Sequence, residues 1–192
     1  MICKKGKFFL VIYLFLFLSL SGCGMQASPD KVVEKYCAEL LTTGKMYDKL
    51  VDNLSAENKR SKDVKFSDNQ IQRLASACVE RIRKCHIQSK VLAINGNDAK
   101  VEVTVERVKV DKILNEKNTK EQLLQKTQNI YDMKQKYNIA IDMLIDAIPQ
   151  APVDGTKSFT VECNYNQEKK EWTIKYPDGV LRNYFDSALS GI

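Results

Sequence analysis

The amino-acid sequence predicts an α+β fold in which helices pack on an antiparallel sheet of about four strands. Three observations lead to this prediction. Apolar residues recur every three or four positions between residues 29 and 85, which is typical of amphipathic helices. Apolar and polar residues alternate between 87 and 110, and again between 159 and 176, as in strands joined by hairpins. Helical spacing returns in residues 111–148, between the two hairpins.

The first segment of the chain has the layout of a secretory signal. Lys4, Lys5 and Lys7 form a basic start, and an unbroken apolar run from Phe8 to Leu18 follows. This run is shorter than the about 20 apolar residues that a membrane helix needs. It ends in the tetrapeptide at which bacterial lipoproteins are lipidated and cleaved, namely Leu20, Ser21, Gly22 and Cys23.

This pattern sets the expected domain boundaries. Residues 1–22 are expected to be a lipoprotein signal peptide, 23–28 a lipidated tether, and 29–192 a single α+β domain. Cys23 would carry a diacylglyceryl thioether and hold the chain at the extracytoplasmic face of a bacterial cell membrane. An ordinary signal peptide that is cut nearby is the alternative.

Charge offers no reason to expect a nucleic-acid partner. The formal charge is +6, and removal of residues 1–22 takes away three lysines and no acid. The remaining Lys and Arg residues are mixed with acids, as in Glu168-Lys169-Lys170-Glu171, so no basic stripe forms.

Helices are expected before the first hairpin. Ser28 and Pro29 read as an N-cap followed by proline at the first helical position. A second short helix follows Gly44, and the charged stretch Ser55–Lys65 is expected to be a surface loop. Ser67 and Gln70 then fit a capping box that fixes the start of the next helix.

Two hairpins and a further helix complete the expected elements. Asn95-Gly96-Asn97-Asp98 joins two strands, and in the second of them Val101, Val103 and Val105 share one face. Residues 111–148 are expected to form one long helix, which Pro149 ends. Its apolar face carries Leu123, Ile130, Tyr137 and Leu144, which recur every seven residues. A second hairpin turns at 166–170, and an amphipathic helix carrying Leu181, Tyr184 and Phe185 closes the domain.

Four cysteines stay in the mature domain after Cys3 leaves with the signal and Cys23 takes the lipid. They are Cys37, Cys78, Cys85 and Cys163. An extracytoplasmic setting permits disulfides between them. Each also occupies an apolar position of its segment, so buried free thiols are the other interpretation.

The sequence contains no recognisable catalytic, metal or cofactor motif. The one histidine, His86, follows Cys85 at a helix-to-strand junction, where neighbouring side chains point to opposite faces. Cys78 and Cys85 are seven residues apart, which does not match the close-spaced ligand pairs of zinc sites. We therefore expect no catalytic residue, no metal and no cofactor.

Several stretches together resemble a family of bacterial lipoproteins of unknown function that carry a cystatin-like domain related to nuclear transport factor two. They are Glu39–Lys45, Val91–Val103 and Lys170–Ile174, with the capped helix between the first two. The resemblance implies that helices pack into the concave side of a curved antiparallel sheet. It also implies an anchored binding or scaffold role, and it supplies no catalytic residues.

These observations favour a non-catalytic module that binds a protein, a peptide or a small apolar ligand through the sheet concavity or the long helix. The first alternative is a small pocket enzyme of the isomerase or hydrolase type, which would need a buried carboxylate. The second is an immunity or oligomerisation partner protein, which would show an exposed apolar patch on the long helix.

Overall fold

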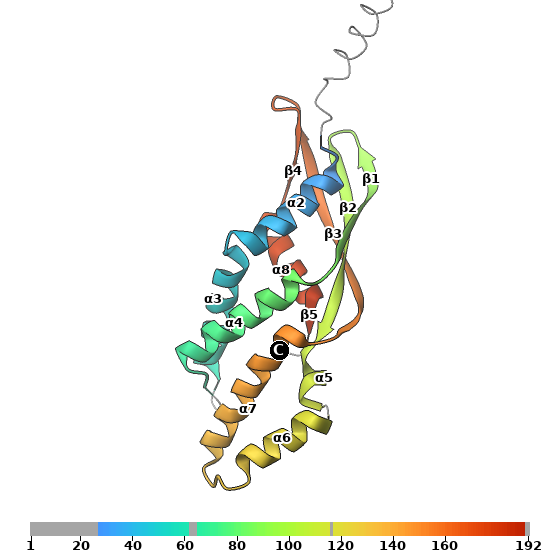
Figure 1. Cartoon of the computed structure of the whole chain (residues 1–192). Helices are drawn as coiled ribbons and strands as arrows, with labels where there is room; N and C mark the ends of the chain where they lie inside the picture. Colours follow the sequence, from blue (N-terminus) through green and yellow to red (C-terminus); the bar gives the residue numbers. More distant parts are fainter. Residues whose placement is uncertain (1–26, 62–64, 116, 191–192) are drawn as a thin grey trace, which may run out of the picture.

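The computed structural model describes residues 27–61, 65–115 and 117–190, and it confirms the α+β fold. Helices lie against one face of an antiparallel sheet (Figure 1). The signal peptide and Cys23 lie outside the described residues. The helices are α2 (Pro29–Thr42), α3 (Lys45–Arg60), α4 (Asp68–Arg83), α5 (Val110–Asn115), α6 (Lys117–Thr127), α7 (Met133–Ala147) and α8 (Pro177–Ala188), with a short 3₁₀ helix η1 (Ile148–Gln150). The strands are β1 (Ile87–Asn95), β2 (Asp98–Lys109), β3 (Val153–Asn166), β4 (Glu171–Ile174) and β5 (Leu189–Ser190).

The sheet has the order β1-β2-β3-β4, and each neighbouring pair is antiparallel. Both hairpins predicted from the sequence are confirmed. In the first, Asn95 pairs with Asp98 across a two-residue turn, and Gly96 there has φ +59°, a left-handed conformation that glycine adopts without steric cost. The short strand β5 adds a parallel pairing to the far end of β2, which the sequence pattern did not predict.

The core lies between the sheet and the helices. Val101, Val103 and Val105 of β2 are fully buried, as their alternation predicted. Helix α2 packs across β1, β2 and β4, and α8 packs across β2 and β3. Tyr184 of α8 is the largest fully buried side chain in the described part of the chain. The inner face of the sheet is therefore covered by the protein's own helices.

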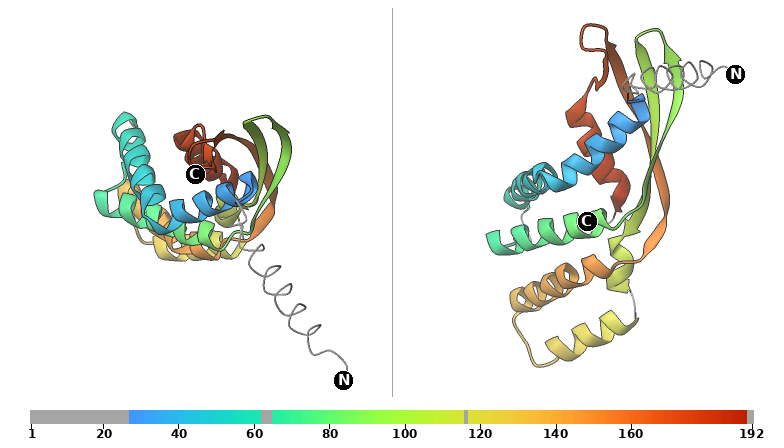
Figure 2. Two further views of the ribbon diagram at one scale, coloured as in Figure 1. Left: turned by 90° about the horizontal axis from the view of Figure 1, so that it is seen from above. Right: turned by 45° about the horizontal axis from the view of Figure 1, so that its top comes forward.

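The prediction of one long helix over 111–148 is wrong, because the described residues of this segment form α5, α6 and α7. The chain reverses between α6 and α7, which pack on each other as a hairpin at the end of the molecule away from the sheet (Figures 1 and 2). The Thr127 hydroxyl bonds to the carbonyl of Leu123 at 2.7 Å in the last turn of α6. Asp132 then caps α7, since its carboxylate accepts a hydrogen bond from the Lys134 amide at 2.9 Å.

The prediction of a loop over Ser55–Lys65 is wrong in its first half. Helix α3 continues to Arg60, and its last turn contains an ion pair between Glu57 and Arg60 at 2.9 Å. Charged residues that are good helix formers therefore extend the helix along the surface. The expected capping box is confirmed: Ser67 accepts from the Gln70 amide, and the Gln70 side chain accepts from the Ser67 amide.

The molecule is elongated, and different elements form its two ends (Figure 1). One end contains the turns of both hairpins and the first turn of α2 (Figures 1 and 2). The opposite end is made by α6 and α7. Helices α3 and α4 lie between these ends, beside the sheet.

Candidate functional site

An apolar groove opens between α3, the start of α4, α7 and α8. Its volume is about 740 Å³. The walls are mostly aliphatic and aromatic. We call this hollow the helix groove, and the side chains that define it are Leu54, Phe66, Ile71, Ile141, Leu144 and Phe185.

The apolar walls follow from helical spacing. Leu50 and Leu54 are four residues apart on α3, so both point to the same side of that helix. On α7, Tyr137, Ile141 and Leu144 recur at four and three residues and share one face in the same way. The sequence showed the apolar stripe of α7. It did not show that the groove forms opposite α3.

The rim of the helix groove contains polar groups that are already satisfied. Glu57 and Arg60 form the ion pair of α3, and their side chains are 70% and 75% exposed. Asn58 bonds both to the amide of Phe66, at 2.8 Å, and to its carbonyl, at 2.9 Å. Asn58 thereby holds Phe66 in the groove wall. Of the described residues that line the groove, only Glu57 bears a carboxylate.

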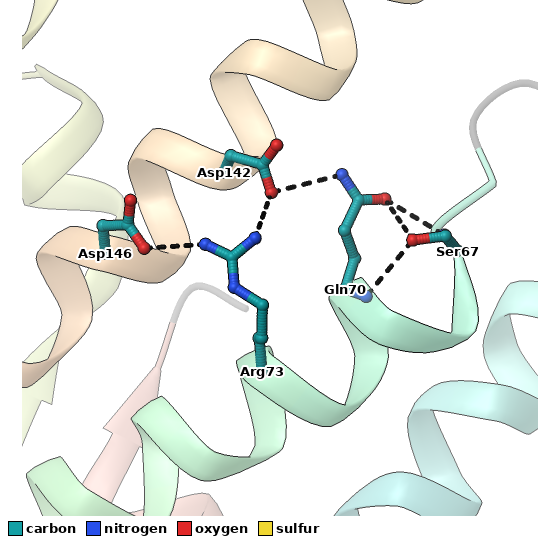
Figure 3. A network of polar contacts seen from close by, with 5 residues as sticks. All are labelled: Ser67, Gln70, Arg73, Asp142 and Asp146. Carbon is teal, nitrogen blue, oxygen red and sulfur yellow. Dashed lines mark hydrogen bonds and ion pairs between the residues drawn. The ribbon is translucent and has the colours of Figure 1, made fainter.

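A polar network holds α7 against α4 beside the groove (Figure 3). The Arg73 guanidinium bonds to Asp142 at 2.7 Å and to Asp146 at 2.8 Å, one turn further along α7. These two hydrogen bonds raise the pKa of Arg73 above its ordinary value. Gln70, a member of the capping box, approaches Asp142 at 3.5 Å. The start of α4 and the position of α7 are thus fixed by one set of side chains.

A second, more polar hollow adjoins the helix groove. It has a volume of about 710 Å³, lies between α3 and α8, and shares Leu50 and Phe185 with the groove. Its charged residues include both signs, and they are Lys49, Glu57, Arg60, Asp178, Arg182 and Asp186. An amphipathic ligand could place its apolar part in the helix groove and its polar part here.

The four cysteines of the domain are buried free thiols in this structure. Burial raises the pKa of Cys37 and of Cys78 to about 12, and that of Cys163 to about 11. Burial also raises the pKa of Cys85, against the opposing effect of the nearby Arg81. Thiols in this state are poor nucleophiles at neutral pH.

The side chains of the neighbours Cys85 and His86 differ in exposure and in their contacts. The Cys85 thiol is buried and lies 3.6 Å from the Arg81 guanidinium. His86 is exposed, and its Nε2 lies 3.0 Å from the side-chain nitrogen Nε2 of Gln88. The expectation that the two side chains lie on different sides is therefore confirmed.

Within 27–61, 65–115 and 117–190, no group of three or more His, Cys, Asp or Glu side chains could hold a metal ion. No helix in these same ranges has the length and apolar character needed to cross a membrane.

Comparison with known proteins shows a likeness to a solved structure. No protein-family model matches the sequence, and no curated protein matches it. The fold is similar to the crystal structure of YcdA, a presumed lipoprotein of Bacillus subtilis, with a TM-score of 0.55 and 15% identity. The match covers 76% of this chain and 45% of YcdA, so the chain spans less than half the length of that protein. At this identity the likeness shows a shared fold.

Proposed function

We propose that this chain is a bacterial lipoprotein, held at the extracytoplasmic face of the cell membrane through Cys23, and that it binds an apolar ligand in the helix groove. The ligand would be a peptide or a small molecule. The observation that carries this proposal is the groove itself, whose volume of about 740 Å³ and apolar walls are typical of ligand sites.

Lipid attachment is supported by the Leu20-Ser21-Gly22-Cys23 sequence after the apolar segment. The presumed lipoprotein YcdA shares the fold, and this structural likeness supports the proposal independently of the sequence motif. Several acyl chains on one residue would hold the chain firmly, because each buried methylene contributes about 0.8 kcal/mol and a single chain is marginal. We also propose that the sheet with its packed helices is a divergent cystatin-like domain.

Binding is favoured over catalysis by the chemistry of the groove. A pocket enzyme of the isomerase or hydrolase type would place a carboxylate in an apolar environment that raises its pKa. Glu57, the carboxylate at this site, is instead exposed and paired with Arg60. The apolar walls can contribute affinity through burial of the ligand's surface.

A substitution that fills the groove tests the proposal. Ala140 of α7 lines the groove, and Ala140→Trp would place an indole in the space that a ligand needs. Gln135→Trp is the matched control, because Gln135 is an exposed residue on the same helix. Titration with a fluorescent fatty acid should show binding to the wild type and the control, and about tenfold weaker binding to Ala140→Trp, which is about 1.4 kcal/mol. Equal affinity of all three proteins would exclude the helix groove as the site.

A protein partner is a second candidate, and the α6–α7 hairpin favours it. Tyr131, between the two helices, is 96% exposed, and Leu124 and Met133 nearby are also exposed. Apolar side chains gathered at a protruding end are typical of interaction surfaces. Light scattering of the purified protein should then show a complex that Tyr131→Ser weakens, whereas a wild-type monomer would argue against self-association.

A further inference from the structure

The turns of both hairpins meet at the end of the molecule where α2 begins. The Asn97 carbonyl of the first turn accepts hydrogen bonds from the Tyr165 amide, at 2.7 Å, and from the Asn164 side chain, at 3.1 Å. The first turn of α2 is tied to the same sheet, because the Ser89 hydroxyl bonds to the Asp30 carbonyl at 3.0 Å. We call this region, residues 27–31, 92–100 and 163–174, the hairpin end (Figures 1 and 2).

The hairpin end lies next to the proposed anchor. Five residue steps separate Cys23 from Ser28, and a fully extended chain covers at most about 18 Å in that number. An acyl group on Cys23 would therefore hold the hairpin end within a short distance of the lipid headgroups. This step rests on the proposed lipid attachment.

Two aliphatic side chains are exposed at the hairpin end, and two half-buried aromatic rings lie in the same region. On β1, Leu92 is 51% exposed and Ile94 is 53% exposed. Ile94 pairs with Ala99, which faces the core, so Ile94 lies on the side of the sheet that α2 occupies. Tyr165 and Trp172 pair across β3 and β4 near this end, with their ring centroids 5.3 Å apart. These residue types suit a bilayer surface, where Trp and Tyr favour the headgroup level and aliphatic side chains enter the acyl boundary.

The charges at the hairpin end are balanced. The Asp98 carboxylate forms an ion pair with Lys175 at 2.9 Å, and Glu168 precedes Lys169 in the second turn. Electrostatic attraction to anionic lipids is therefore not the main contribution to contact with a bilayer. Contact with a bilayer would depend on the apolar side chains and would persist at high salt.

We propose that the hairpin end is a lipid-docking surface, with Leu92 and Ile94 in the acyl boundary and Tyr165 and Trp172 at headgroup level. The contact orients the domain. The α6–α7 hairpin, at the opposite end, then points away from the membrane (Figure 2).

The fluorescence of Trp172 tests this contact, because it is the one tryptophan of the chain. The lipidated protein is reconstituted into vesicles of phosphatidylethanolamine and phosphatidylglycerol that contain a phospholipid with a nitroxide near its headgroup. Quenching of Trp172 is expected in the wild type, at low and at high salt. The double variant Leu92→Ser/Ile94→Ser should lose this quenching while it stays bound through its lipid. The matched control Leu124→Ser/Met133→Ser changes two exposed apolar residues at the opposite end and should keep it.

The outcomes separate this inference from the proposed function. Mass spectrometry of the same preparation shows whether Cys23 is acylated. An acylated, vesicle-bound wild type without quenching would overturn the docking surface alone, as would quenching that survives Leu92→Ser/Ile94→Ser. An unmodified Cys23 would overturn the proposed anchor, and with it the orientation. All four substituted residues are exposed, and circular dichroism checks that the variants are folded.

Discussion

Raising the pH above 9 should destabilise this fold steeply, because it buries thiols in their protonated form. The ordinary pKa of these thiols is 9.0, and burial raises it to about 12 for Cys37 and Cys78 and to about 11 for Cys163. A group whose pKa is raised by folding contributes stability that is fully present below its unfolded pKa. That contribution is lost as the pH rises toward the folded value.

The size of the effect follows from these pKa values. At about pH 10 the three thiols are mostly ionised in the unfolded chain and protonated in the folded one. Each thiol then lowers the free energy of unfolding by slightly more than 1 kcal/mol. The three thiols together lower it by about 4 kcal/mol relative to its value at neutral pH. The free energy of unfolding of a whole domain is about 5–15 kcal/mol, so a decrease of this size should be easy to measure.

Urea unfolding followed by circular dichroism, at about pH 7 and about pH 10, measures this loss. The variant Cys78→Ala removes one of the three thiols and should reduce the loss by about a third. A free energy of unfolding that stays within about 1 kcal/mol across this range would refute the reasoning. Disulfides among these cysteines would give that result, and a thiol count in denaturant would then show fewer than four.

Three further predictions concern local contacts. Ser67→Ala removes the cap of α4 and should lower the free energy of unfolding by about 1 kcal/mol in urea titrations, whereas no change would show that the capping box is dispensable. Gly96→Ala places a side chain at φ +59° with open space around it, so its cost should be conformational only, about 1 kcal/mol; unchanged thermal stability would contradict this. Arg73→Ala should loosen the attachment of α7 and speed its amide hydrogen exchange, less so at high salt. Arg60→Ala, which breaks a pair within α3, is the control for α7, and equal exchange in both variants would show that the network does not hold the helix.

Local signals in the sequence predicted the hairpins and the starts of α2, α3 and α4 correctly. Asn95-Gly96-Asn97-Asp98 forms the expected turn because a left-handed residue is needed there and glycine supplies it. Ser67 and Gln70 form the expected capping box because its donors and acceptors lie within four residues of each other. Such features depend on neighbours in the chain and can be read from it.

The division of residues 111–148 could not be read in the same way. The reversal after α6 contains neither glycine nor proline, which are the strongest signs of a turn, and only Asn129 and Asp132 mark it. The seven-residue spacing of Leu123, Ile130, Tyr137 and Leu144 continued across the turn and suggested one helix. Contacts between α7 and α4, such as that of Arg73 with Asp142, decide where α7 lies.

The helix groove also depends on distant parts of the chain. It brings together α3, α4, α7 and α8, and no local pattern shows that these elements meet. The sequence did predict that Val101, Val103 and Val105 share one face of their strand, and all three are buried in the core. It placed the binding surface on the sheet concavity or the long helix, and α7, which lies within that predicted helix, lines the groove.

Intact mass measurement of the protein extracted from its own bacterial membrane tests the central claim most directly. A lipid-anchored protein should give the mass of a chain that begins at Cys23 and carries a diacylglyceryl group on its sulfur. A chain that retains residues 1–22, or one whose Cys23 bears no lipid, would contradict both the anchored function and the membrane-facing role of the hairpin end.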